Sequence, residues 1–403
     1  MEAIFPRRDG MRRPVPPRML LSSQLETHSK CKKEPAVKKH SKKTEQGPKT
    51  LCPEQPESTI GIDVGDRYSH YCQLDAAGEI VKRGRIPSTQ AALEKELGQI
   101  GRARIAIETG THCHWMNEVL QGLGHEVIVA DARELKSISG SHRKNDARDA
   151  EQLARLARAD VRLLHPVHLR ERKTRQDRSV LRAREAVVEA RTQLICAIRG
   201  MVKADGTRLK KCSTEAFVEG VREAIPAGMR RAVEPLLEVL KELNGKIRAY
   251  DELVERMGQE EYPETKLLRQ VAGVGPVTAL YYRLTLEDAE RFQHSRDVGA
   301  YLGLAPKQQE SGESAPQLRI SKAGDEGLRR LLVSCAHYIL GPFGPDSDLR
   351  RWGLKLASRG GKNAKKRAVV GVARKLAVLL HRLWANGEVY EALRGSKAST
   401  VAA

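Results

Sequence analysis

Hydrophobic and polar positions in residues 58–165 fall into short strand-like runs separated by polar turns and by segments with helical spacing. The first run, residues 59–65, is apolar and closes on glycine, and a second run at 68–74 follows directly. Three adjoining strands, followed by alternating strands and helices, predict a mixed sheet with covering helices, an α/β fold. The further elements expected are strands at 79–86, 104–107 and 125–130, and helices at 90–97, 115–123 and from 146 onward.

The pattern changes to long helices in residues 166–260. Apolar positions recur every seven or four residues, as in Val180, Val187, Leu194 and Ile198. Such spacing predicts a helical hairpin or a coiled-coil arm, although an ordinary helical bundle would show the same periodicity.

Glycine interrupts the helical pattern again in residues 261–345. The stretch 267–280 contains Gly273 and Gly275 between two helical segments, which indicates a helix-hairpin-helix element able to hold a phosphate, or else a helix break used only for packing. A helix is expected at 328–340. Residues 346–403 form a basic helical tail, in which 350–382 hold eleven Lys and Arg and no acid. That tail is either a solvated face or a nucleic-acid contact.

The amino-acid composition limits the kinds of partner that the chain is expected to bind. The chain has 403 residues with 71 Lys and Arg against 51 Asp and Glu, a net charge of +20, which favours a polyanionic partner without separating DNA, RNA and anionic membrane. No run approaches the length of a membrane-spanning helix and no signal peptide is evident, so a cytoplasmic protein without a membrane contact is expected. Residues 1–57 are basic and Pro-rich and are expected to be disordered, and the seven cysteines to be reduced thiols.

Four acids stand out against this basic background. Asp63 and Glu108 each end an apolar strand, while Asp146 and Asp149 lie three apart at the start of a helix and so share one helix face. Converging carboxylates are hard oxygen ligands suited to Mg2+, which supports phosphoryl transfer. Such acids are also common turn formers and N-caps, and glycines beside an acid occur in phosphate loops of actin-like or sugar-kinase ATPases. The strand layout is that of ribonuclease H-like nucleases.

A serine, Ser311, lies on a Gly-flanked loop beside basic residues. Taken alone it is either a nucleophile or an ordinary surface serine.

In their joint order these motifs resemble the DEDD transposases of bacterial insertion-sequence family one-ten, over about residues 58–345. The motifs that carry the resemblance are residues 61–65 (GIDVG), 107–110 (IETG), 144–150 (KNDARDA), 271–276 (VAGVGP), 302–306 (LGLAP), 311–312 (SG) and 320–324 (ISKAG). The basic N-terminal extension and the tail after Pro342 lie outside it.

The resemblance implies a RuvC-like nuclease domain at 58–165, a coiled-coil arm at 166–260 and a C-terminal transposase domain at 261–345. The tail at 346–403 is expected from charge and helical pattern alone. The resemblance also implies that the four acids bind Mg2+ and act with a C-terminal serine nucleophile, for which Ser311 is favoured over Ser314 and Ser321. The expected partners are DNA, a structured noncoding guide RNA and further copies of the chain in a dimer or tetramer at the bacterial nucleoid. The expected nucleic-acid-binding residues are Lys144, Gly273, Gly275 and Lys322.

Two other functions are compatible with the same sequence. A RuvC-like junction endonuclease would need the acids but no serine, and a non-catalytic nucleic-acid-binding protein would need neither.

Overall fold

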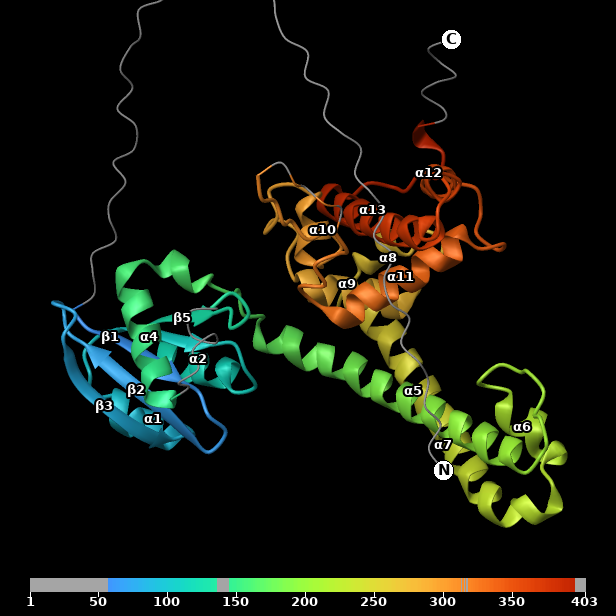
Figure 1. Cartoon of the computed structure of the whole chain (residues 1–403), viewed down its shortest axis with the longest axis horizontal. Coiled ribbons are helices and arrows are strands. Elements are labelled where there is room, and N and C mark those ends of the chain that lie inside the picture. The colour runs from blue at the N-terminus through green and yellow to red at the C-terminus, as the bar shows by residue number, and fades with distance from the viewer. Residues whose placement is uncertain (1–56, 136–144, 313, 315, 317, 396–403) are drawn as a thin grey trace, which may run out of the picture. The chain divides into compact units, whose positions relative to one another are not determined.

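The computed structural model describes residues 57–135, 145–312, 314, 316 and 318–395, so the N-terminal extension lies outside the described residues (Figure 1). The first elements form a five-stranded mixed sheet in the order β3-β2-β1-β4-β5. Strands β1, β2 and β3 are antiparallel neighbours, while β4 and β5 run parallel to β1. The strands are β1 Thr59–Asp63, β2 Tyr68–Leu74, β3 Ile80–Pro87, β4 Arg104–Glu108 and β5 Glu126–Ala130.

Helices cover both faces of this sheet. Ile60, Ile62, Ile105 and Ile107 pack with buried residues of α1 and α2 on one face. The alternate positions, Ala106 among them, pack with α4 on the other face, as period-two alternation requires. The α/β prediction is therefore confirmed. The helices are α1 Gln90–Leu97, α2 Cys113–Gly122 and α4 Asp146–Ala159, followed by the short η1 Val161–Leu164.

Two long helices follow, α5 (Arg172–Ala204) and α7 (Ala227–Glu260). They are antiparallel, because Arg184 bonds to Asp251 at 2.5 Å whereas Arg191, further along α5, bonds to the earlier Asn244 at 3.0 Å. The C-terminal end of α5 and the N-terminal end of α7 share an apolar cluster with the small helix α6 and with Ile225, which follows the turn η2. The segment is thus a helical hairpin with its own core at the tip. The tip elements are α6 Phe217–Val221 and η2 Arg222–Ala224.

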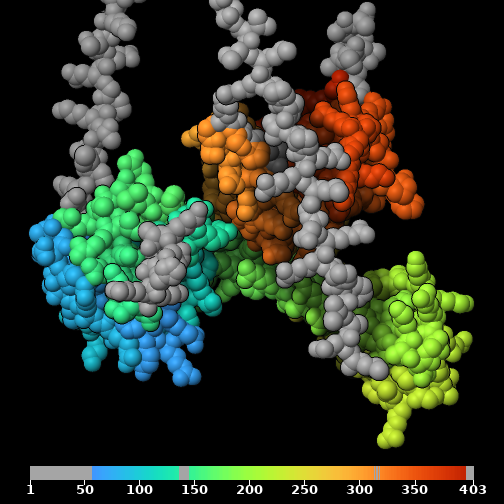
Figure 2. Space-filling view, viewed as in Figure 1, coloured from blue at the N-terminus to red at the C-terminus, as the bar shows by residue number. Residues whose placement is uncertain are grey.

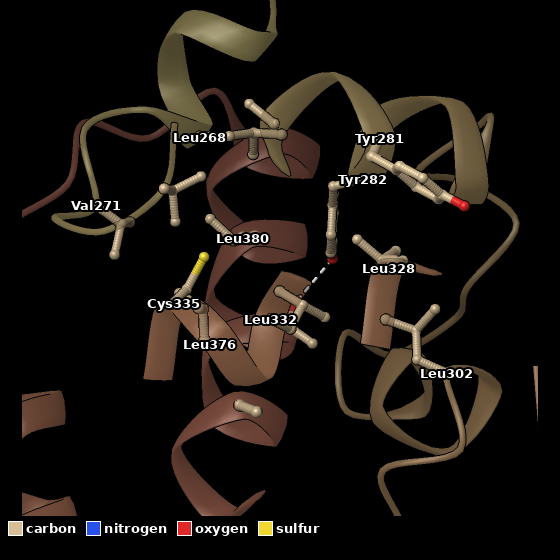
Figure 3. Close-up of a cluster of buried hydrophobic side chains, with 14 of the residues drawn as sticks. Leu268, Val271, Tyr281, Tyr282, Leu302, Leu328, Leu332, Cys335, Leu376 and Leu380 are labelled. Atoms are coloured by element: carbon tan, nitrogen blue, oxygen red, sulfur yellow. Dashed lines mark hydrogen bonds between the residues drawn. The ribbon is translucent and has the colours of Figure 1, made fainter. Parts of the chain in front are cut away.

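The remaining helices surround one large core (Figure 3). The Tyr282 side chain is fully buried there, and its hydroxyl donates to the Ala377 carbonyl at 2.6 Å, which ties α9 to α13. Helix α13 contributes buried residues to the same core as α9 and α11, so this part of the predicted basic tail packs against the core. The helices are α8 Thr265–Leu268, α9 Pro276–Leu286, α10 Asp297–Tyr301, α11 Glu326–Leu340, α12 Asp348–Ala357 and α13 Ala364–Asn386.

The glycine-rich stretch forms the turn between α8 and α9. Gly273 has a φ of +89°, and a Cβ there would lie 2.8 Å from the Tyr338 ring on α11. Both the backbone conformation and the close approach require glycine at this position. Across the described residues, no helix is both long and apolar enough to span a membrane.

Candidate functional site

Asp63 and Glu108 lie side by side at one edge of the sheet. Strands β1 and β4 are parallel neighbours, with Ile62 opposite Ile107, so the next residue of each strand is an acid at the strand's C-terminal end. Side chains alternate along a strand, which places Asp63 on the same face as Gly61, and Glu108 on the same face as Ala106. This is the face covered by α4.

Helix α4 brings the other two acids to the same edge. A Cβ on Gly61 would lie 2.1 Å from the Ala150 carbonyl oxygen and 2.4 Å from the Ala154 nitrogen, so the helix backbone rests directly on β1. At the other end, the Arg104 guanidinium at the start of β4 donates to the Ala157 carbonyl at 3.4 Å. The helix therefore runs antiparallel to β1 and β4, with its N-terminus over the strand ends.

The two helix acids differ in their surroundings. The Asn145 side chain accepts from the Ala147 amide at 3.0 Å and caps the helix. Asp149 is buried, with 7% of its surface exposed, whereas Asp146 is exposed. Asp149 thus belongs to the sheet-facing side of α4, and Asp146 lies at its rim.

His70 on β2 is a fifth member of this edge, and it was missed in the sequence. It lies opposite Asp63 in the β1–β2 register, and its Nδ1 is 3.6 Å from Asp146 Oδ2. The sequence shows that His70 lies on the same face of its strand as Cys72 and Leu74, because the three residues are two apart. Its position opposite Asp63 depends on the pairing register of β1 and β2, which the sequence does not show.

The donor set at this edge suits a hard divalent cation, because its members are carboxylates, with one imidazole nearby. Within residues 57–135 and 145–395, as far as they are described, no three Asp, Glu, His or Cys side chains are arranged to hold a metal ion in this conformation. The backbone nevertheless brings the ends of β1 and β4 and the first turn of α4 to one edge of the sheet. Lys144, expected to bind nucleic acid, lies outside the described residues.

The serine loop extends from a small β-bridge in the C-terminal core, not from the sheet edge. Pro306 bridges Ile320, and the Ser321 amide donates to the Ala305 carbonyl at 2.8 Å. At the far end of the loop, Ser311 and Ser314 exchange both backbone hydrogen bonds, at 3.2 and 3.0 Å, around Gly312. Ser311 is exposed, while Ser321 is half-buried and accepts from the Ala323 amide.

Comparison with known proteins identifies the family. Residues 60–206 match a family model described as "Transposase", and residues 265–347 match the model "Transposase IS116/IS110/IS902 family". The chain is 30% identical over 350 residues to "Putative transposase y4pF/y4sB" of Sinorhizobium fredii, covering 83% of this chain and 86% of that protein. The chain belongs to the IS116/IS110/IS902 family of transposases.

Two other relatives align over most of their length. "Probable family 20 transposase" of Pseudomonas aeruginosa is 28% identical over 344 residues, with 83% of this chain and 98% of that protein covered. "Transposase for insertion sequence element IS1111A" of Coxiella burnetii is 27% identical over 344 residues, with 82% and 90% covered. The predicted family is thus confirmed, and with it the enzyme class, a DNA transposase.

In this transposase the base of the serine loop is held by buried ionic contacts. Asp325 caps α11 by accepting from the Leu328 amide at 2.8 Å, and it pairs with Arg178 of α5 at 2.5 Å. Burial alone would raise the pKa of the Asp325 carboxyl, but the amide hydrogen bond and the Arg178 guanidinium hold it below its ordinary value. Arg329 donates to the carbonyls of Leu302 and Ala323 at 3.1 and 3.0 Å and joins the two sides of the bridge.

The remaining expected nucleic-acid contacts lie on turns of the C-terminal core. Lys322 is exposed and has a φ of +57°, with its amide donating to the Gly303 carbonyl at 3.1 Å. This left-handed conformation is uncommon for a residue with a side chain. Gly275 is extended at the N-cap of α9, and a Cβ there would have open space around it, unlike one at Gly273.

Proposed function

We propose that this transposase cuts and joins DNA at the sheet edge formed by Asp63, Glu108, Asp146 and Asp149, with a divalent metal ion, Mg2+, held by these acids. The observation that carries the proposal is the approach of α4 to β1 at Gly61, because it directs the helix acids toward the ends of two parallel strands that both end in acids. We take the sheet to be a ribonuclease H-like, RuvC-like domain.

The residues divide the chemistry between them. Asp63, Glu108, buried Asp149 and Asp146 at the rim would hold the ion, and His70 would orient Asp146. Bound Mg2+ supplies charge neutralisation at the phosphate under attack. Ser311, exposed at the tip of its loop, is the proposed nucleophile: its hydroxyl loses a proton as its oxygen bonds to phosphorus, and the departing sugar oxygen takes up a proton.

DNA recognition is assigned to surfaces other than the acids and Ser311. We propose that the turn with Gly273 and Gly275 acts as a helix-hairpin-helix contact to DNA phosphates, with Lys322 and Lys144 as further contacts. A guide RNA encoded by the element would select the sequence by base pairing, and a dimer or tetramer in the cytoplasm would bring Ser311 to the acids. The protein itself would then need to contact only the sugar-phosphate backbone of the nucleic acid.

The metal assignment is tested with Asp63→Asn and Asp149→Asn, which keep side-chain size but remove charge. Each should abolish transposition of a marked element while the purified protein still binds DNA. Asp160→Asn is the matched control, because Asp160 lies at the opposite end of α4 and pairs with Arg162. Normal transposition by Asp63→Asn would reject the assignment.

The serine assignment is tested by trapping protein covalently joined to labelled DNA. Wild type and Ser321→Ala should form the adduct, and Ser311→Ala should not. If Ser311→Ala still cleaves branched DNA at the normal rate, the chain acts instead as a junction endonuclease.

A further inference from the structure

The net charge of this chain is concentrated in one short stretch. Residues 350–382 hold eleven of the 71 Lys and Arg and none of the 51 Asp and Glu, so they carry +11 of the net +20. The stretch covers most of α12, the turn after it and most of α13. Figure 2 shows the orange-red segment around α12 on the outside of the C-terminal helices.

The two helices form a tightly packed scaffold. A Cβ on Gly353 would lie 2.5 Å from a Val372 methyl carbon, so α12 and α13 approach closely there. On the next turn the Lys375 ammonium lies 4.2 Å from the centre of the Trp352 ring. These contacts, and the burial of α13 in the C-terminal core, give the connecting turn a fixed support.

Six cations around that turn pair with no acid in the part of the chain that the structure describes. We call the six of them the cationic turn. Each is exposed, and none forms an ion pair with an acid of the described chain. By contrast, Arg351 pairs with Asp346 at 2.5 Å and Arg382 lies 3.6 Å from Glu388, both away from the turn. The cationic turn consists of Lys355, Arg359, Lys362, Lys365, Lys366 and Arg367.

This arrangement is unfavourable for the protein alone. Lys365, Lys366 and Arg367 occupy the first turn of α13, which contains no acid, although the helix macrodipole favours negative charge there. Six like charges on one turn also repel one another. A bound polyanion would offset both the unfavourable cations at the helix N-terminus and the repulsion among the six like charges. Neither feature stabilises the folded protein by itself.

We propose that the cationic turn binds the phosphate backbone of double-stranded DNA. The inference rests on the proposed function, and it adds a binding surface remote in sequence from both the acids and Ser311. Lysine and arginine side chains on a rigid helical hairpin would contact several phosphates at once and position the duplex without reading its bases. The Gly360-Gly361 backbone, with φ of +78° and +89°, makes the turn compact, and a Cβ on Gly361 would lie 3.7 Å from Arg367 Nη2. The Arg367 guanidinium thus folds back over the turn.

The test is the salt dependence of DNA binding by the full chain, measured by fluorescence anisotropy with a labelled duplex. The variant is Lys362→Gln/Lys365→Gln/Lys366→Gln. The matched control, Lys210→Gln/Lys211→Gln/Lys241→Gln, removes the same charge from exposed positions of the helical hairpin. Each phosphate contact contributes about 0.9 to the slope of log K against log salt. The cationic-turn variant should therefore lower the slope by about 2.7 and weaken binding at least about ten-fold at about 0.1 M salt, and the control should change neither.

Two outcomes would overturn the proposal. Equal losses in the two triple variants would show that net charge, not this surface, governs binding. A loss confined to an RNA duplex of the same length, with DNA binding unchanged, would assign the turn to RNA. Neither outcome affects the proposed function, which fails separately if Asp63→Asn remains active. Equal thermal unfolding midpoints for the three proteins would show that folding is unchanged.

Discussion

His70 Nδ1 on β2 lies 3.6 Å from Asp146 Oδ2 in the first turn of α4. Because His70 is also opposite Asp63 in the β1–β2 register, one imidazole is next to acids from two different elements. In the proposed site it therefore acts as a positioning residue, which fixes the rim acid relative to the strand acid.

His70→Ala is expected to lower transposition about 10- to 100-fold, as is usual when a group that orients metal ligands is removed. The loss should be partly restored by raising the Mg2+ concentration, because the acids remain but are less well positioned. A purely structural role would lower activity at all Mg2+ concentrations alike. Gln73→Ala on the same strand, where the side chain contacts Ser58, is the control and should change little.

Gly61→Ala is expected to be one of the most damaging single-methyl additions in the chain. The new Cβ would overlap the backbone of α4 at Ala150 and Ala154, and backbone atoms cannot rotate away. We expect a loss of unfolding free energy of about 1–3 kcal/mol, the range for overpacking, together with loss of transposition. Urea unfolding measures the first quantity.

Gly200→Ala is the control for that substitution. Gly200 lies within α5, and an added Cβ meets nothing within 4 Å. Alanine should therefore stabilise this helix by about 0.5–1 kcal/mol. A stable Gly61→Ala protein would contradict the close packing of α4 on β1.

The Arg178–Asp325 pair predicts acid sensitivity of the C-terminal core. The folded pKa of Asp325 is lowered, so its charged form stabilises the fold above its unfolded pKa of about 3.9, and that contribution is lost as the pH falls through the lower folded value. Unfolding free energy measured from pH 5 downward should fall less steeply in Asp325→Asn than in wild type. Parallel curves would contradict this assignment.

Removing the partner of that acid has a larger effect. Arg178 is buried and also donates to the Thr285 hydroxyl at 2.7 Å. Arg178→Met leaves Asp325 without its cation and should cost about 3–5 kcal/mol of unfolding free energy at neutral pH. The double variant with Asp325→Asn should recover part of that loss, since no buried charge is then unpaired.

Lys322→Gly separates stability from function. Lysine adopts the left-handed conformation here at a cost of about 1–2 kcal/mol, which glycine avoids, although glycine loses more entropy on folding. The variant should be as stable as wild type, or up to about 1 kcal/mol more stable. Its DNA affinity should nevertheless fall. Unchanged affinity would remove Lys322 from the binding surface.

The sequence predicted the local elements closely, because their signals are local. Strand β2 and helix α1 have the predicted bounds, since alternation and a Thr89 cap mark them directly. Helix α12 was predicted only as part of a basic helical tail, without bounds of its own, because its apolar positions lie within a run dominated by charge. Helix α13 was likewise predicted as part of that tail, and its burial against α9 depends on contacts far apart in the chain, such as Tyr282 with Ala377.

The four acids of the candidate site could be named from the sequence, but the way in which the fold brings them to one edge of the sheet could not. Asp63 and Glu108 could be assigned to strand ends by pattern alone. Strand register decides that β1 pairs in parallel with β4, and packing decides that the backbone of α4 lies against Gly61. His70 was missed for the same reason. The roles of the acids and of Ser311 stay predictions until the variants are measured.

The position of α13 in the C-terminal core has a consequence for truncated copies of the gene. The core draws on residues from Leu181 to Leu383, so it cannot close until α13 has been synthesised. A premature stop or frameshift before α13 would leave Tyr282 and its neighbours exposed to water, even with every acid and Ser311 still encoded. Gene copies truncated before α13 are therefore expected to encode a misfolded and inactive transposase.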